Sequence, residues 1–375
     1  MLVVLALVLV QLGSLVRPAY ACGCGGMVPG RNTTLAVQRE SSVLRWDGRS
    51  EQIVMSLTVR GDAPEAAWIM PVPHRATVTL GNQALFDDVR SVTAPVDKDR
   101  HYFWPRDGDW PLGDDDHSVG AAPDGARAGA PSVGVVGRER LGPFDVARLT
   151  ATDPDALRDW LEGHGFELPD RLADGLTPYV RAKWEYVAVR LAPADKGRRA
   201  VLEGTLDPLR LTFASERLVY PMRLSRLART PQALELYVLA PHRMEPRGDI
   251  GGRPPEVVYA GRVGRDRSSH GQLAELAGGR PMFLTALRQD FPWPERILGD
   301  HELRRTARDD PYQQVVYHDT LLTVGGVPVW LLTVGGGLLA VAAAVFTALT
   351  VRRRRRPVAR AWPGDPAPAQ DNWPS

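Results

Sequence analysis

The chain has 375 residues, of which 44% are hydrophobic and 24% are charged, so it is long enough to bury a core and to form one to three folded units. Its formal net charge is +2, but six arginines and two aspartates lie after Val351, which leaves residues 22–351 with a net charge of −3. A mildly acidic central region has no basic field that would attract nucleic acid, and this excludes nucleic acid as a class of partner.

The first residues have the composition of a signal peptide. Residues 2–12 form an apolar run broken only by Gln11, and a run of about ten residues is too short to cross a bilayer. Ala-Tyr-Ala at residues 19–21 places small residues at the −3 and −1 positions of a cleavage site. We predict a signal peptide over residues 1–21, although no positive charge precedes the apolar run. An uncleaved, buried N-terminal helix is the alternative.

Residues 327–351 contain no charged side chain, and about 20 apolar residues suffice for a helix to span a bilayer. Trp330 stands near the start of this segment, where an indole prefers the membrane interface. By the positive-inside rule, the five arginines that follow act as a stop-transfer signal and stay in the cytoplasm: Arg352, Arg353, Arg354, Arg355 and Arg356. These features predict a single-pass protein of the cell membrane, in contact with the lipid bilayer, with its N-terminus outside and a disordered cytoplasmic tail over residues 352–375.

Small residues recur at every fourth position of the predicted span, at Gly336, Ala340, Ala344 and Ala348. Such a stripe allows two helices to approach closely, so it is a candidate surface for self-association through the membrane. An alanine-rich span also produces stripes of this kind by chance.

The region between the two membrane signals, residues 22–320, has the pattern of an extracytoplasmic α+β domain rich in hairpins. Two strand-like runs, residues 43–46 and 52–59, flank Asp47-Gly48, a pair that suits a tight turn. A helix is expected from Asn82, and another over residues 153–165 with Pro154 in its first turn. Further strands are expected in the segments AAWIMPVP, KWEYVAVRLAP, PLRLTFAS, ERLVYPMRLS, ALELYVLAP, EVVYAGRV and QQVVYHDT, and a weak amphipathic helix in PERILGDHELRRT.

Residues 105–142 are rich in Gly, Ala, Pro and Asp and have little to bury, which predicts a flexible insert. We favour one domain interrupted by this insert over two domains, because the roughly eighty residues before it make a marginal unit on their own.

Catalytic motifs are absent from the sequence, and its eight histidines have no ligand-like spacing. An acidic cluster could hold calcium through its oxygen atoms, and consists of Asp107, Asp109, Asp114, Asp115 and Asp116. The cluster lacks the central glycine and terminal glutamate of a calcium loop, so a solvated acidic loop is the simpler interpretation. No other cofactor is predicted.

The two cysteines of the chain, Cys22 and Cys24, are one residue apart. Outside the cytoplasm thiols tend to oxidise, which favours a disulfide between them, although a bridge over one residue is strained. The alternatives are a free or intermolecular pair, lipidation of Cys22, and thiol redox chemistry.

Several segments together resemble a bacterial family of unknown function, DUF2330. They are ACGCGG, WDGRSEQIVMSLTV, AAWIMPVP and PLRLTFASERLVYPMRLSRLA, followed by a terminal span with an arginine cluster. The resemblance covers most of the central region and implies a secreted or membrane-anchored protein of high-GC Gram-positive bacteria. It implies no activity and no functional residues.

Three functions fit these features. A cell-surface binding or interaction module is favoured by the single span and the lack of catalytic motifs. An ectoenzyme, hydrolytic or thiol-redox, is the main alternative, and a structural protein of the cell envelope, acting with an envelope partner or with itself, is the third.

Overall fold

The computed structural model describes residues 21–22, 24–106, 109, 139–141, 144–149, 154–192, 201–264 and 271–354. The predicted signal peptide, most of the predicted insert and the C-terminal tail lie outside these residues. The chain divides into two compact units, and each is described by itself. Unit 1 consists of residues 1–96 and 127–316, and unit 2 of residues 97–126 and 317–375.

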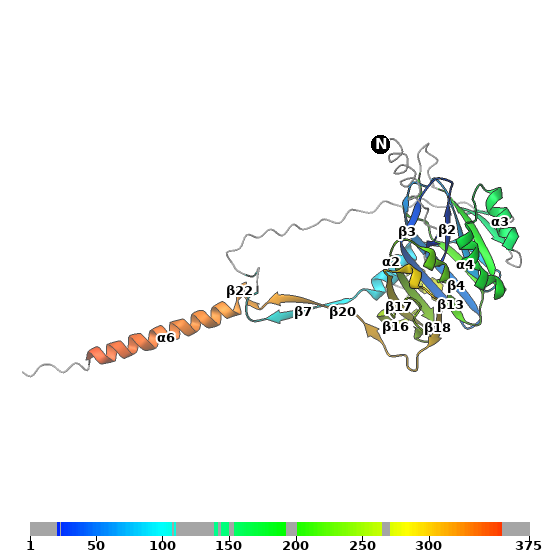
Figure 1. Ribbon diagram of the computed structural model, residues 1–375. Helices are drawn as coiled ribbons and strands as arrows, with labels where there is room; N and C mark the ends of the chain where they lie inside the picture. The colour runs from blue at the N-terminus through cyan, green and yellow to red at the C-terminus, as the bar shows by residue number, and fades with distance from the viewer. Residues whose placement is uncertain are drawn as a thin grey trace, which may run out of the picture. The chain divides into compact units, whose positions relative to one another are not determined.

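Two sheets form the centre of unit 1 (Figure 1). In the described residues the smaller sheet is antiparallel, with the order β1 (Ala21–Cys22), β2 (Gly25–Pro29), β5 (Ala66–Val72), β10 (Glu185–Leu191), β9 (Phe144–Leu149) and β8 (Glu139–Leu141). The larger sheet has the order β19 (Tyr312–Gln313), β16 (Glu256–Val263), β17 (Met282–Phe291), β14 (Gln232–Ala240), β3 (Leu35–Trp46), β4 (Ser50–Gly61), β12 (Leu209–Ala214) and β6 (Thr77–Leu80), while β11 (Gly204–Thr205) also pairs with β4. Its β14–β3 pair is parallel, so a mixed, mostly antiparallel sheet faces the smaller one.

The main core lies between the two sheets. Alternate residues of β5 and β4 point inward because successive side chains of a strand face opposite sides. Trp68 and Met70 of β5 and Ile53 and Met55 of β4 all belong to this core. Every residue of β5 is buried, which accounts for its almost wholly apolar sequence.

Helices cover the outer face of each sheet. On the smaller sheet, α3 (Pro154–Gly163) and α4 (Asp170–Arg181) bury Leu161, Leu172 and Leu176 against residues such as Ile69 and Ala188. On the larger sheet, α2 (Ala84–Thr93) and α5 (Gly271–Ala277) pack over Val43 and Leu239 in the same way. The four layers are therefore helix, sheet, sheet and helix, and the predicted α+β class is confirmed.

A third, three-stranded sheet consists of β13 (Leu218–Tyr220), β18 (His301–Arg305) and β15 (Met244–Pro246). Two short 3₁₀ helices, η1 (Arg223–Leu227) and η2 (Pro294–Arg296), lie close to each other. This small sheet and η1 bring distant parts of the chain to the end of α4.

Local signals predicted several of these elements correctly. The hairpin of β3 and β4 is confirmed, with Gly48 at a φ of +99° and Asp47 Oδ1 accepting hydrogen bonds from the backbone N–H groups of Arg49 and Ser50. The helix expected from Asn82 is α2, and the side-chain Oδ1 of Asn82 accepts from Ala84 N–H at 3.0 Å just before the helix begins.

Two predictions need correction. The amphipathic helix expected over residues 294–306 is wrong, because only η2 is helical and β18 follows it. Residues 301–304 alternate between buried and exposed, so their period of two suits pairing with β13 and β15. The strand expected over residues 216–225 ends at Tyr220, before Pro221, and η1 begins at Arg223.

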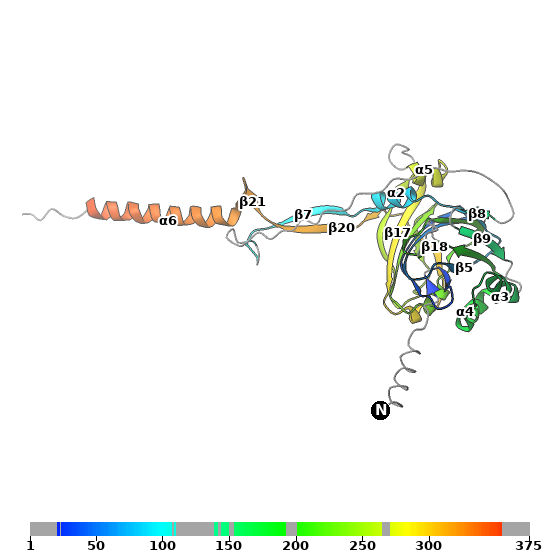
Figure 2. The ribbon, with the colours of Figure 1, turned by 90° about the horizontal axis from the view of Figure 1, so that it is seen from above.

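Unit 2 begins with a two-stranded ribbon of β7 (Val96–Tyr102) and β20 (Val315–Leu321). The first residues of these strands, Val96, Val315 and Val316, belong to unit 1. A small hairpin of β21 (Thr323–Val324) and β22 (Val327–Pro328) follows, and then α6 (Val329–Arg354), as Figure 2 shows. With a mean hydropathy of 2.2, α6 is the one helix among the described residues that is long and apolar enough to span a membrane. The described part of the chain thus has one candidate membrane helix near its C-terminus.

Candidate functional site

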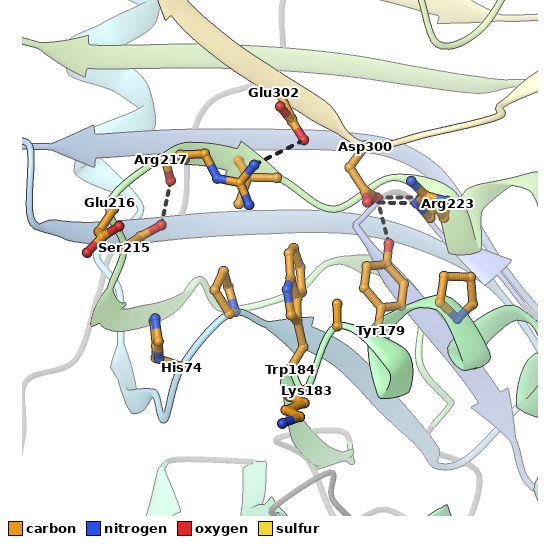
Figure 3. Close-up of a pocket in the computed structure, with 14 residues that line it drawn as sticks. His74, Tyr179, Lys183, Trp184, Ser215, Glu216, Arg217, Arg223, Asp300 and Glu302 are labelled. Carbon is orange, nitrogen blue, oxygen red and sulfur yellow. Dashed lines mark hydrogen bonds and ion pairs between the residues drawn. The ribbon is translucent and has the colours of Figure 1, made fainter.

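A cleft of about 480 Å³ lies in unit 1 at the end of α4 (Figure 3). Five separate segments line it: the end of β5, the last turn of α4, the turn between β12 and β13, η1, and the start of β18. The side chains that matter for its chemistry are His74, Tyr179, Lys183, Trp184, Ser215, Glu216, Arg217, Arg223, Asp300 and Glu302.

Asp300 fixes one wall of this cleft. Its Oδ1 accepts hydrogen bonds from the Tyr179 hydroxyl at 2.6 Å, from Met222 N–H at 2.8 Å and from Arg223 N–H at 3.1 Å. Its Oδ2 accepts from the Arg223 guanidinium at 2.9 Å. Burial is the main cause that raises the pKa of Tyr179 far above its usual range, and the negative charge of Asp300 raises it further. The phenol therefore stays protonated and donates, and α4, η1 and the start of β18 meet on one carboxylate.

The end of α4 places Trp184 in the cleft. Trp184 N–H donates to Tyr179 C=O at 3.0 Å and Lys183 N–H donates to Val180 C=O at 2.9 Å, which is the bonding pattern of a Schellman motif. The Trp184 ring packs on Tyr179 with 5.0 Å between ring centroids. In Figure 3 the indole rises between the end of α4 and the β12–β13 turn, toward Arg217.

Lys183 occupies the left-handed position of this motif, with a φ of +58°. Glycine normally takes this position because a Cβ there costs about 1 kcal/mol. Among the described residues the other non-glycine with positive φ is Asn32, a residue type that tolerates the conformation. Lys183 is also one of three lysines beside 43 arginines in the chain. A strained residue in a cleft is typical of a functional site.

This strain predicts a difference between two variants at the same position. We expect Lys183→Gly to be about 1 kcal/mol more stable than Lys183→Ala, because only glycine relieves the positive φ. Urea unfolding of the full-length chain in detergent, followed by tryptophan fluorescence, measures both values. Equal stability of the two variants would show that the backbone at this position is unstrained.

Charged side chains of both signs surround the indole. Lys183, Arg217 and Arg223 stand with Glu216, Asp300 and Glu302 in the lining, so the formal charges cancel. The Arg217–Glu302 pair is long, at 3.9 Å, and both side chains are largely exposed. Breaking this exposed ion pair costs little free energy, so both side chains can contact a bound ligand instead.

The β12–β13 turn rests on a buried carboxyl. Glu51 is fully buried, and its Oε2 accepts from Val219 N–H at 3.3 Å. Burial raises the pKa of Glu51 well above its ordinary value. Trp46 Nε1 donates to Ser215 C=O at 3.1 Å from the same hairpin. The β3–β4 hairpin thus holds the turn that carries Arg217.

A second polar cluster lies inside the main core, around Glu40. The backbone N–H of Cys24 donates to both Glu40 oxygens, at 3.1 and 3.0 Å, and the Tyr220 hydroxyl donates to Oε1. Ser42 Oγ lies 2.6 Å from the Tyr220 hydroxyl, and Cys24 Sγ lies 3.7 Å from the sulfur of Met55. The cluster joins the ACGCGG segment to β3, β4 and β13.

The glycines of ACGCGG have a packing role beside this cluster. A Cβ at Gly25 would lie 2.5 Å from Trp68 Nε1 and 2.6 Å from the Ile69 carbonyl oxygen. No side chain fits there, so β2 approaches β5 only with glycine at this position. The side chain of Cys22 lies outside the described residues, and its disulfide with Cys24 stays a prediction.

None of the predicted site residues whose side chains the structure describes lines the cleft. Of the acidic cluster, Asp109 is described, and its Oδ2 accepts from the Tyr102 hydroxyl and from Arg106 N–H, each at 2.7 Å. The four other aspartates lie outside the described residues, and within the described part no group of three His, Cys, Asp or Glu could hold a metal. The stripe Gly336, Ala340, Ala344 and Ala348 is exposed on α6. Arg352, Arg353 and Arg354 form the last turn of α6, and Arg355 and Arg356 lie outside the description.

Two signals in the sequence pointed toward the cleft. The segments AAWIMPVP and FASERLVYPMRLS, which carry the resemblance, supply Pro73, Ser215, Glu216, Arg217 and Arg223 to its lining. Lysine is rare in the chain, and the cleft lining contains Lys183, one of its three lysines. Neither signal identifies Asp300 or Trp184, because the spacing of these residues in the sequence follows no motif.

Comparisons with known proteins give one family. A family model described as "Uncharacterized protein conserved in bacteria (DUF2330)" matches residues 18–304. No curated protein matches the chain. Among solved structures, the chain is similar to baculovirus P35 at 8% sequence identity, with 75% of this chain and 97% of that chain covered and a TM-score of 0.29.

Proposed function

The chain belongs to the bacterial family DUF2330, and from this premise we propose that it is a membrane-anchored binding module that takes a neutral saccharide in the cleft beside Trp184. In this proposal α6 anchors the chain, the arginines after Val351 stay in the cytoplasm, and unit 1 works outside the cell. The function is recognition of a ligand at the cell surface.

The partly exposed indole of Trp184 carries the proposal. Its Nε1 forms no hydrogen bond within the described part of the chain, and one ring neighbour, Tyr179, supports it from the side. An aromatic ring that is held in place yet open to solvent offers a flat apolar surface with one donor at its edge. The C–H face of a sugar ring stacks on such a surface.

The polar lining suits hydroxyl groups. Each hydroxyl both donates and accepts, so carboxylates and guanidinium groups can serve it side by side. Glu216 and Glu302 supply acceptors to the lining of the cleft, and Arg217 supplies donors. Since the formal charges of the lining cancel, a neutral ligand is favoured over an acidic or a basic one. Pockets with an aromatic surface and a few convergent polar groups are typical binding sites.

Asp300 has a positioning role in this proposal. Four donors already use its two oxygens, so it holds Tyr179 and Arg223 in place and leaves ligand contacts to the exposed side chains. Asp300 itself is therefore not available as a catalytic acid or base, a role that needs a carboxyl free to reach the substrate.

Binding is tested with the full-length protein in detergent on an array of neutral and acidic oligosaccharides, followed by calorimetric titration of the strongest neutral binder. We expect Trp184→Ala to weaken that binding at least tenfold, because the stacking surface is lost. Trp293→Ala is the matched control, since Trp293 is 48% exposed and lies outside the cleft. The proposal fails if no neutral saccharide binds at millimolar concentration, or if both variants bind like the wild type.

A further inference from the structure

An aromatic tip in unit 2 lies beside the start of α6. It consists of Phe103 and Trp104, which follow directly on β7. Leu322 N–H donates to Tyr102 C=O at 2.9 Å, and Val329 N–H donates to Leu322 C=O at 2.9 Å. Two backbone hydrogen bonds therefore connect the residue before the tip with the first residue of α6.

The tip is apolar and exposed. Trp104 is 63% exposed and Phe103 is 36% exposed, and the two rings meet edge to face with centroids 5.0 Å apart. Val324 and Val327 of the adjoining β21–β22 hairpin are 63% and 41% exposed. Exposing an apolar ring of this size to water is unfavourable, so contact with an apolar medium would stabilise the tip.

Several contacts give the tip a defined shape. The Arg106 guanidinium lies 4.1 Å from the centre of the Tyr102 ring, and the Tyr102 hydroxyl donates to Asp109. Asp319 of β20 pairs with Arg106 at 2.8 Å and with Arg100 at 2.6 Å. These two arginines hold the pKa of Asp319 far below its usual range. Arg100, Arg106 and Asp319 are thus paired along the ribbon, and among the described residues neither ring of the tip has a cation over its face.

The length of α6 places its start at the membrane interface. From Val329 to Val351 the helix has 23 residues without a charge, which corresponds to about 34 Å. The hydrocarbon layer is about 30 Å thick. The first turn of α6, with Trp330, therefore reaches the headgroup region, where aromatic side chains are enriched. The tip is connected to this turn and meets the same layer.

We propose that Phe103 and Trp104 insert into the interfacial layer of the lipid bilayer beside α6, as a second membrane contact of the chain. The inference rests on the placement of α6 in the membrane that is part of the proposed function. Continuity with the span favours lipid as the occupant of this surface over a second copy of the chain.

The experiment uses the full-length protein in phosphatidylcholine vesicles, with and without lipids brominated near the headgroup, which quench tryptophans at that depth. We expect Trp104→Phe to lose a quenched component of about one tenth of the total emission, since the chain has ten tryptophans. Trp293→Phe is the matched control, because Trp293 is an exposed tryptophan of unit 1, and it should lose only unquenched emission.

Flotation of the vesicles separates the two ways of failing. Protein that does not float with the lipid contradicts the membrane anchor of the proposed function and overturns the inference with it. Protein that floats, but whose quenched emission is the same in the wild type and in Trp104→Phe, overturns the inference alone. If Trp104→Phe instead abolishes a dimer seen by sedimentation and leaves quenching unchanged, a second copy covers the tip and the lipid contact is wrong.

Discussion

The Asp300→Ala variant is expected to have a free energy of unfolding about 4 kcal/mol below that of the wild type. The substitution removes the acceptor for the Tyr179 hydroxyl and for the backbone N–H groups of Met222 and Arg223. Each buried donor left without a partner costs about 1–3 kcal/mol, and breaking a buried charge pair costs about 3–5 kcal/mol. At the low end of this range the three donors account for about 3 kcal/mol. Because Arg223 is 41% exposed, its ion pair is screened by solvent and adds only about 1 kcal/mol.

Two variants make this measurement specific. Asp300→Asn keeps an oxygen at the Oδ1 position and loses the contact of Oδ2 with Arg223, so we expect a loss of about 1–2 kcal/mol. Glu302→Gln changes an exposed carboxylate whose arginine partners lie 3.8 and 3.9 Å away, and it should stay within about 0.5 kcal/mol of the wild type. Urea unfolding of the full-length chain in detergent gives all three values. If Asp300→Ala costs no more than Glu302→Gln, the four bonds do not hold α4 to η1.

Features that depend on residues close together in the sequence could be predicted from it. The Asp47-Gly48 turn, the helix that begins after Asn82 and the uncharged run that forms α6 each depend on a few consecutive residues, and the structure has all three. The segment from Pro294 was misread because its apolar residues fit a helical spacing. Pairing of β18 with β13 and β15 determined its conformation, as tertiary contacts often override local preference.

The cleft could not be predicted in the same way. Its lining comes from five segments spread over more than two hundred residues, and a single sequence contains no signal for which of them meet. Asp300 lies in the segment that the sequence predicted as an amphipathic helix, and its role appears only when α4 and η1 are packed against it. Lys183 is one of three lysines in the chain, and its positive φ depends on the end of α4, which the sequence does not show.

The Glu40→Ala variant, which disrupts the buried Glu40 cluster, is expected to have a free energy of unfolding about 4 kcal/mol below that of the wild type. Glu40, Ser42 and Tyr220 are each at most 2% exposed. Removing the carboxyl takes away a buried acceptor of the Cys24 N–H and the Tyr220 hydroxyl, with Ser42 Oγ left beside the hydroxyl, and it also opens a cavity in the core. Glu245→Ala is the matched control, since Glu245 is an exposed carboxylate paired with Arg304 at 2.9 Å, and it should change stability by less than about 1 kcal/mol.

The Glu40→Gln variant tests the protonation of this cluster. Burial raises the pKa of Glu40 above its ordinary value of 4.5, and the hydrogen bonds from Tyr220 and Cys24 offset this only in part. The folded chain therefore binds this proton more tightly than the unfolded chain does. The stability that the proton contributes is fully present below pH 4.5 and is lost as the pH rises through the folded pKa.

Because glutamine carries no such proton, the stability of the wild type relative to Glu40→Gln should increase as the pH falls from 8 toward 4.5. Glu51 has a pKa raised in the same direction, but it is present in both proteins and cancels from the difference. Urea unfolding of both proteins at several pH values in this window measures that difference. A difference that stays constant with pH would mean that Glu40 is ionised at its ordinary pKa. The donors from Cys24 and Tyr220 would then offset burial completely, and the segment ACGCGG would be held by a full negative charge in the core.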